Sequence, residues 1–260
     1  MTSSSGSGDR ILAIIDLYTQ ERSEWLPEDM MQALGYSRPT LYRYLKSLKD
    51  AGFLVSLPNR GFTLGPRVTE LDFLMHRTDR LIDLGRPAIK DLARQFSCSA
   101  FITRWYGEKL LCVSSEVSAP KAISSYPRGR PMPLGRGAIS HVIIANLPKL
   151  QRDELVARYC DEFKCAGWGT SEEEIQNDLL KVRRRGFAVA RGEVTKGVIG
   201  IAAPILSGKD SPDAALCLTI EQSLVDDALL KTISASLSQH ARTISIALNS
   251  ITPNPSSKKE

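Results

Sequence analysis

The segment SRPTLYRYLKSLK, residues 37–49, gives the clearest indication of how the first part of the chain folds. If these residues form an α-helix, their apolar side chains lie on one face of it. These inward residues are Leu41, Tyr44, Leu45 and Leu48. The opposite face carries Arg38, Pro39, Tyr42, Arg43 and Lys46, with Lys49 at its edge. The stretch holds four basic residues and no acid, so it predicts an amphipathic helix with a basic outer face.

Two helices are predicted before this stretch. Asp9 suits an N-cap, and the apolar spacing that follows it predicts a helix over residues 10–20. Pro27 suits the first turn of a second helix, which ends before Gly35 because glycine can adopt the left-handed conformation. Ser37 then caps the third helix. A helix, a short turn containing glycine and a second helix form the helix-turn-helix pattern.

A short hairpin is predicted after the third helix. Residues 53–56 and 61–64 suit strands, and residues 57–60 suit the turn between them. Arg60 then lies at the tip of a wing, where it can reach the backbone or the minor groove of DNA. An exposed loop arginine without function is an equally good interpretation.

A winged helix-turn-helix, predicted over residues 9–65, places the first turns of its recognition helix in the major groove of DNA. Arginine can bond guanine, and side-chain hydroxyls suit phosphates. The candidate DNA contacts are Ser37, Arg38, Pro39, Thr40, Tyr42, Arg43, Lys46 and Arg60. A merely solvated basic face is the alternative, which the preceding helix and the following wing make the weaker one.

The composition permits this interpretation without requiring it. The chain has 260 residues, which predicts one small and one medium domain. Its formal net charge is +5, but residues 1–65 hold seven basic and seven acidic side chains, so a DNA-binding face must be local. Residues 1–8 and 251–260 are rich in small and polar residues and are predicted to be flexible tails.

Several classes of protein are disfavoured by the sequence. No run of 18 apolar residues and no signal peptide are present, which predicts a soluble cytoplasmic protein without a membrane partner. Five scattered cysteines predict free thiols, although Cys160 and Cys165 could chelate zinc if two further ligands joined them. His76, His141 and His240 lack metal-ligand spacing and are expected to be ordinary surface or helix residues. We expect neither a metal nor a cofactor.

The rest of the chain mixes helices and strands. Residues 66–84 have helical spacing and predict a linker that also serves as a dimer helix. Residues 85–250 predict a sensor domain with a central, largely antiparallel sheet. Its expected helices cover residues 87–96, 137–146, 148–160, 171–185 and 224–248. Its expected strands cover residues 98–105, 109–115, 187–193, 198–206 and 214–220.

Several motifs resemble those of the IclR-type bacterial regulators. They include residues 37–45, the sequence Ala-Gly-Phe at 51–53, Phe-Thr-Leu-Gly at 62–65 and, in the second half, Gly-Trp-Gly-Thr at 167–170 and residues 197–204. The resemblance covers nearly the whole chain. It implies an α+β fold, in which a winged helix-turn-helix precedes a GAF-like α/β effector-binding domain, and it implies that Arg43 touches DNA.

The resemblance also implies an effector pocket in the second domain. Carried over by position, the residues that line it are Ser124, Met132, Ala138, Ile139, Ala190, Val198 and Gly200. The chain departs from the family where Ser140 and His141 replace a Gly-Lys pair, and where Ala190 and Gly200 replace polar residues of some members. These departures predict a more apolar pocket and a larger or aromatic organic acid.

The charge partner of such an acid is left open. Lys121, Arg128 and Arg130 could neutralise a carboxylate, or they could be solvated loop residues. The segment Gly-Arg-Gly at 135–137 neither follows a strand nor completes a phosphate-binding motif, so no phosphate loop is expected there.

The favoured hypothesis is a regulator that binds operator DNA as a homodimer, or as a tetramer, and responds to a small organic acid. The first rival is an enzyme that acts on a small acid and uses its N-terminal domain for assembly. It lacks support because Ser140 and His141, adjacent on a helix, point in different directions and do not suit a nucleophile and its base. The second rival is a winged helix that binds only proteins.

Overall fold

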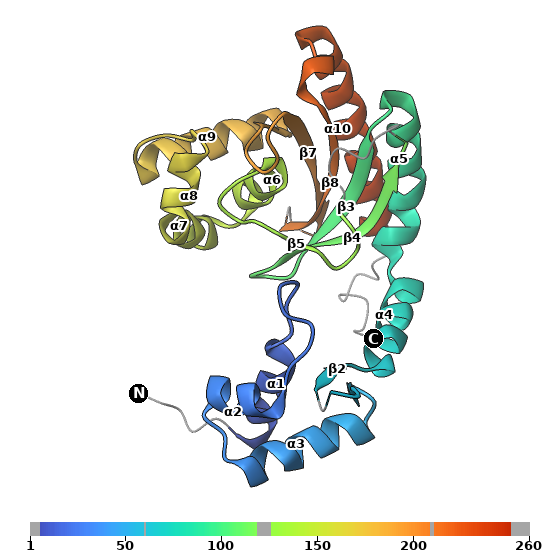
Figure 1. Cartoon of the computed structure of the whole chain (residues 1–260). Coiled ribbons are helices and arrows are strands. Elements are labelled where there is room, and N and C mark those ends of the chain that lie inside the picture. Colours follow the sequence, from blue (N-terminus) through green and yellow to red (C-terminus); the bar gives the residue numbers. More distant parts are fainter. Residues whose placement is uncertain (1–5, 60, 119–125, 209–210, 251–260) are drawn as a thin grey trace, which may run out of the picture. The chain divides into compact units, whose positions relative to one another are not determined.

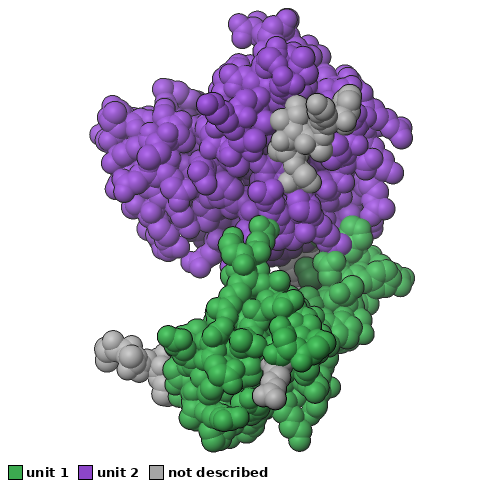
Figure 2. All heavy atoms as spheres, viewed as in Figure 1, with its two compact units in different colours: residues 1–79 green, residues 80–260 purple. Residues whose placement is uncertain are grey.

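The computed structural model describes residues 6–59, 61–118, 126–208 and 211–250. The chain divides into two units, residues 1–79 and residues 80–260, which Figure 2 shows in green and purple. Each unit buries hydrophobic residues of its own, in one cluster in the first unit and two clusters in the second.

Three helices form the core of the first unit. They are α1 (Ser7–Asp16), α2 (Pro27–Leu34) and α3 (Arg38–Asp50). Ile14, Met30 and Leu41 are fully buried where these helices meet. Gly35 ends α2 with φ of 66°, in the left-handed conformation that its position predicts. The predicted helix-turn-helix is therefore confirmed (Figure 1).

The start of α1 differs from the prediction. The helix begins at Ser7, within the predicted tail, and Asp9 lies inside its first turn instead of preceding it. From there the Asp9 carboxylate accepts a hydrogen bond of 2.9 Å from the backbone N–H of Gly6. An acid in the first turn can thus satisfy a terminal N–H group without being the N-cap residue.

The wing consists of β1 (Leu54–Ser56) and β2 (Phe62–Leu64), paired antiparallel. Trp25 adds a bridge to Phe62, which the sequence analysis did not predict. The chain passes close to the end of α3 where it leaves the wing. A Cβ atom added to Gly65 would lie only 2.3 Å from the carbonyl oxygen of Gly52. Arg60 lies outside the described residues.

The helices that follow break at a different place from the one predicted. α4 (Pro66–Thr78) ends at an extended Asp79, and α5 (Arg80–Phe96) continues through Pro87, whereas one helix was predicted over residues 66–84 and another over 87–96. A proline inside a helix costs about 3 kcal/mol. α5 tolerates it because its inward side, which includes Leu81, Ile89 and Leu92, is fully buried.

A six-stranded sheet forms the centre of the second unit, in the order β5-β4-β3-β8-β7-β6. All neighbouring strands are antiparallel, which confirms the predicted sheet type. The strands are β3 (Ser99–Trp105), β4 (Leu110–Val117), β5 (Pro131–Met132), β6 (Ala188–Arg191), β7 (Val198–Ser207) and β8 (Ser211–Glu221).

Helices cover both faces of this sheet (Figure 1). One face packs against α5 and α10 (Asp227–Asn249), which follows the short 3₁₀ turn η1 (Gln222–Leu224). The other face packs against the group of α6 (Ala138–Asn146), α7 (Lys149–Arg158), α8 (Cys160–Cys165) and α9 (Glu172–Arg185). The sequence predicted one helix over residues 148–160, and the separate α8 was missed. None of the described helices has the length and apolar character needed to span a bilayer.

Side chains of α10 also form hydrogen bonds with the backbone at the C-terminal end of β7. The backbone N–H of Leu206 donates to the Ser245 hydroxyl at 2.9 Å, and the Asn249 amide donates to the Leu206 carbonyl at 3.3 Å. The Asn249 side-chain oxygen in turn accepts from the N–H of Gly208 at 2.8 Å. These contacts fasten the strand beyond the point where its pairing with β6 ends, at Ala202.

Candidate functional site

The outer face of α3 presents the predicted DNA-contact side chains to solvent. Arg38, Pro39, Tyr42, Arg43 and Lys46 are exposed, while the side chains predicted to face inward are all buried. Ser37 occupies the N-cap position, but its hydroxyl donates to the Thr40 hydroxyl at 3.0 Å instead of capping the backbone. The structure thus gathers seven of the eight predicted residues on and beside one helix, and Arg60 lies outside the described residues.

The cations of this face lack acidic partners. Among the described residues, no carboxylate lies within ion-pair distance of Arg38, Arg43 or Lys46. Arg43 instead lies over the Tyr44 ring, with its Cζ 5.1 Å from the ring centroid. Arg22 differs, because it pairs with Asp29 and lies 3.5 Å from the centroid of Trp25. The basic charge of α3 therefore remains available to an external anion.

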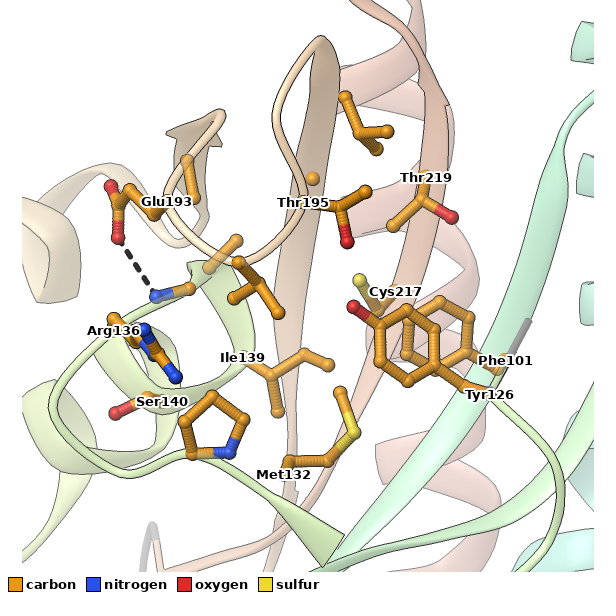
Figure 3. A pocket seen from close by; sticks show the side chains of 17 residues that line it. Phe101, Tyr126, Met132, Arg136, Ile139, Ser140, Glu193, Thr195, Cys217 and Thr219 are labelled. Atoms are coloured by element: carbon orange, nitrogen blue, oxygen red, sulfur yellow. Dashed lines mark hydrogen bonds between the residues drawn. The ribbon is translucent and has the colours of Figure 1, made fainter. Parts of the chain in front are cut away.

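A pocket opens in the second unit between the start of α6, the loop from β6 to β7 and the inner face of the sheet (Figure 3). The free space in and in front of it, open solvent included, is about 440 Å³. The structure brings six of the seven predicted effector residues together around it: Met132, Ala138, Ile139, Ala190, Val198 and Gly200. Ser124, the seventh, lies outside the described residues.

Glycines shape two of the pocket walls. Gly137 starts α6 with φ of 91°, a conformation that favours glycine. Gly200 pairs with Ala190 across β7 and β6, and a Cβ atom there would lie 3.9 Å from the Cβ of Ala138, which is ordinary contact distance. The sheet and α6 are therefore already closely packed at this wall, and the pocket lies beside that contact.

Several polar and aromatic residues of the pocket were not predicted from the sequence. Phe101 and Cys217 line the pocket from β3 and β8. Their neighbours along each strand face the hydrophobic cluster on the other side of the sheet. This alternation along the strands could have identified both residues from the sequence. Figure 3 shows the hydroxyls of Tyr126 and Thr195 close to each other in the pocket wall. Burial raises the pKa of Tyr126, while its hydrogen bond with Thr195 acts in the opposite direction.

The basic residue of the pocket is not one of those considered from sequence. Arg136, part of the rejected phosphate-loop segment, lines the pocket and is exposed. Arg130 lies over the Tyr126 ring instead, with its Cζ 5.1 Å from the centroid, and neither Arg128 nor Arg130 is among the lining residues. Lys121 lies outside the described residues.

A buried polar cluster adjoins the pocket at the start of α6. His141 was expected to be an ordinary surface or helix residue, but its side chain is fully buried and lies 3.7 Å from Trp168, measured between ring centroids. Burial, and secondarily the charge of Arg185, hold the pKa of His141 well below 6.5, so the ring is neutral. Glu193 lies beside His141 in this cluster and also lines the pocket. Sequence spacing carried no signal for it, because the members come from three distant segments.

The cysteines are free throughout the described chain. Cys160 and Cys165 both fall in α8, half-buried and exposed respectively. Within the described ranges, no group of three or more His, Cys, Asp or Glu side chains has an arrangement that could hold a metal ion.

Comparisons with known proteins cover both units. The IclR helix-turn-helix domain matches residues 7–58, and the C-terminal domain of the bacterial transcriptional regulator IclR matches residues 74–246. The regulator XynR of Escherichia coli is 26% identical over 244 residues, which cover 93% of this chain and 96% of that protein. BhcR of Paracoccus denitrificans is 24% identical over 246 residues, which cover 92% and 86%.

Solved structures have the same fold. A putative IclR regulator from a Silicibacter species has a TM-score of 0.79 at 20% identity, covering 95% of this chain and 98% of that chain. An IclR homologue from Microbacterium hydrocarbonoxydans, complexed with 4-hydroxybenzoate, has a TM-score of 0.75 at 18% identity, covering 94% and 99%.

Proposed function

The chain belongs to the IclR family of bacterial transcriptional regulators, with a helix-turn-helix DNA-binding domain and a C-terminal ligand-binding domain, and from this premise we propose how it works. It binds an operator in duplex DNA through the outer face of α3, and a small organic acid in the pocket of the second unit modulates this binding. The observation that carries the proposal is the row of cations on α3 that pair with no carboxylate of the described residues.

The DNA contacts follow from the chemistry of that face. Arg38 and Arg43 suit base edges in the major groove, while Lys46 and the hydroxyls of Ser37 and Thr40 suit phosphates. For Arg60, which lies outside the described residues, we propose a contact to the backbone or minor groove of DNA. Because the first unit carries as many acids as bases in its first 65 residues, this local face supplies the attraction.

The pocket suits an acid with an apolar body. The first N–H groups of α6 and the guanidinium of Arg136 favour a carboxylate, and the rings of Phe101 and Tyr126 favour an apolar or aromatic group. The 4-hydroxybenzoate bound by the relative from M. hydrocarbonoxydans supports an aromatic acid. To regulate, the ligand must bind one arrangement of the protein more tightly than another.

The regulator acts as a homodimer, or as a tetramer of two dimers. α4 has no buried residue, and Phe73, Leu74 and Met75 on it are each half exposed or more. An exposed apolar cluster of this kind suits pairing with a second copy. A two-fold dimer matches two operator half-sites related by the same symmetry.

The protein binds its ligand without transforming it, and it acts in the cytoplasm, where chromosomal operators lie. The Ser140 hydroxyl donates to the carbonyl of Leu134, and the buried ring of His141 lies beside Glu193. Serine and histidine are thus each directed away from the other, which does not support the rival enzyme hypothesis.

Titration of promoter DNA at several salt concentrations tests this function. We expect affinity to fall steeply as salt rises, because cations on α3 displace counterions from the phosphates. Addition of a small organic acid that binds the pocket should change the affinity at fixed salt. A salt-independent interaction would favour a winged helix that binds proteins instead.

A further inference from the structure

Glu193 is an ionisable residue of the pocket whose charge is largely buried. Its side chain retains 9% of its exposed area, although it comes from the loop between β6 and β7. One carboxylate oxygen accepts from the N–H of Gly137 at 2.8 Å, which Figure 3 shows as a dashed line. The other accepts from the indole N–H of Trp168 at 3.1 Å. Both donors are neutral, and the contacts fix the carboxylate at the start of α6.

No cation in the described chain compensates this carboxylate. His141 Nε2 lies 3.4 Å from the nearer oxygen, but it makes no hydrogen bond and its ring is neutral. Arg136 lines the same pocket without forming an ion pair with Glu193. Burying a carboxylate without a cation is unfavourable, and accordingly burial raises the pKa of Glu193.

The carboxylate can still accept hydrogen bonds, because each of its oxygens has two lone pairs and receives one of these two donors. Figure 3 shows Glu193 and Arg136 at the same end of the pocket, with the rings of Phe101 and Tyr126 toward the other. This end therefore offers one positive and one negative group that are not paired with each other, and the rest of the wall is mainly apolar.

We propose that Glu193 is a specificity-determining residue, which makes the pocket select acids that carry a hydrogen-bond donor, an ammonium or hydroxyl group, next to the carboxylate. Arg136 and the start of α6 attract the acid group, and Glu193 accepts from the neighbouring donor. This inference rests on the proposed function and narrows its ligand from an organic acid to an apolar 2-amino or 2-hydroxy acid. An acid without the donor gives the Glu193 carboxylate no hydrogen bond and displaces the water around it, so its binding is disfavoured.

Calorimetric titration of the full chain with two ligand series tests this inference. The aromatic series is 3-phenylpropanoate, 3-phenyllactate and phenylalanine; the aliphatic series is 4-methylpentanoate, 2-hydroxy-4-methylpentanoate and leucine. In at least one series we expect a member with a donor to bind about tenfold or more tightly than the member without it. Glu193→Gln should reduce that preference to less than about threefold.

Two variants separate charge from folding. Glu173→Gln removes a carboxylate from an exposed residue of α9 that does not line the pocket, so the preference should persist. Glu193→Asp retains the charge in the loop and should retain the preference for the donor, with thermal melting to verify that both Glu193 variants fold.

Equal binding of all members in every series that binds, or an unchanged preference in a folded Glu193→Gln chain, would overturn the role of Glu193 while leaving the acid-binding proposal intact. Loss of the preference in a folded Glu193→Asp chain would overturn it as well. If no acid of either series binds the unaltered chain, while DNA binding persists, the proposed ligand class is overturned and this inference with it.

Discussion

Arg22 and Arg43 carry the same charge in the same unit but differ in their surroundings. Arg22 pairs with Asp29 and lies against Trp25, whereas no carboxylate in the described chain pairs with Arg43. A paired arginine at the surface has little charge to offer an external anion. An unpaired arginine on the outer face of a recognition helix can contact DNA without breaking an existing interaction.

Arg43→Ala should weaken operator binding by about 1–3 kcal/mol, because it removes a contact to a base or a phosphate. A gel-shift titration against the promoter fragment measures the effect. Arg22→Ala is the matched control and should leave the affinity nearly unchanged. Equal losses in the two variants would contradict the role assigned to Arg43.

His141 should make the stability of the second unit depend on pH. Its pKa is lowered on folding, so its contribution to stability is present above about pH 6.5, the value of the unfolded chain, and is lost as the pH falls below it. Glu193 has the opposite sign, because its raised pKa favours the folded state as the pH falls. Arg185 adds to the penalty on a protonated His141.

Urea unfolding between pH 7 and pH 5 measures this dependence. The free energy of unfolding should decline by at most about 1.4 kcal/mol per pH unit for the one proton involved. In His141→Gln the decline should be smaller, whatever the overall stability of the variant. The same decline in both chains would show that other groups cause it.

Among the secondary-structure elements, the sequence predicted those helices whose bounds follow from the spacing of their own apolar residues. α3 shows this, because burial of Leu41 and Leu45 follows from their spacing alone. The break at Asp79 did not follow, because the continuity of α5 through Pro87 depends on burial against the sheet. The same limit applies to the pocket. The family resemblance located its residues on β6, β7 and α6. It did not locate Glu193, which is distant from His141 in the sequence and lies next to it only in the folded chain.

Gly65→Ala should destabilise the first unit by about 1–3 kcal/mol, because the new Cβ meets a backbone oxygen that a rotamer change cannot move. Gly8→Ala is the matched control, since α1 offers open space there and alanine favours a helix. Thermal melting by circular dichroism distinguishes them. A melting temperature that rises or stays constant in Gly65→Ala would contradict the close approach of the wing to α3.

At the scale of the whole molecule, pairing of copies depends on the proposal for α4. Leu74→Glu should weaken dimerisation by about tenfold or more, because it places a charge in an apolar contact between copies. Light scattering after size-exclusion chromatography measures the mass across a dilution series. Leu150→Glu on α7, where the side chain is 82% exposed, is the matched control and should leave the mass unchanged. An unaltered dimer in Leu74→Glu would place the interface elsewhere.

The fastening of β7 by α10 bears on how the protein behaves at high concentration. An open strand edge is a template on which another chain can add a strand, and such additions lead to aggregates. Here Leu206 has already given its N–H and its carbonyl to side chains of α10, and Pro204 has no N–H to offer. This stretch of the β7 edge is therefore closed to foreign strands, and aggregation by strand addition is disfavoured there.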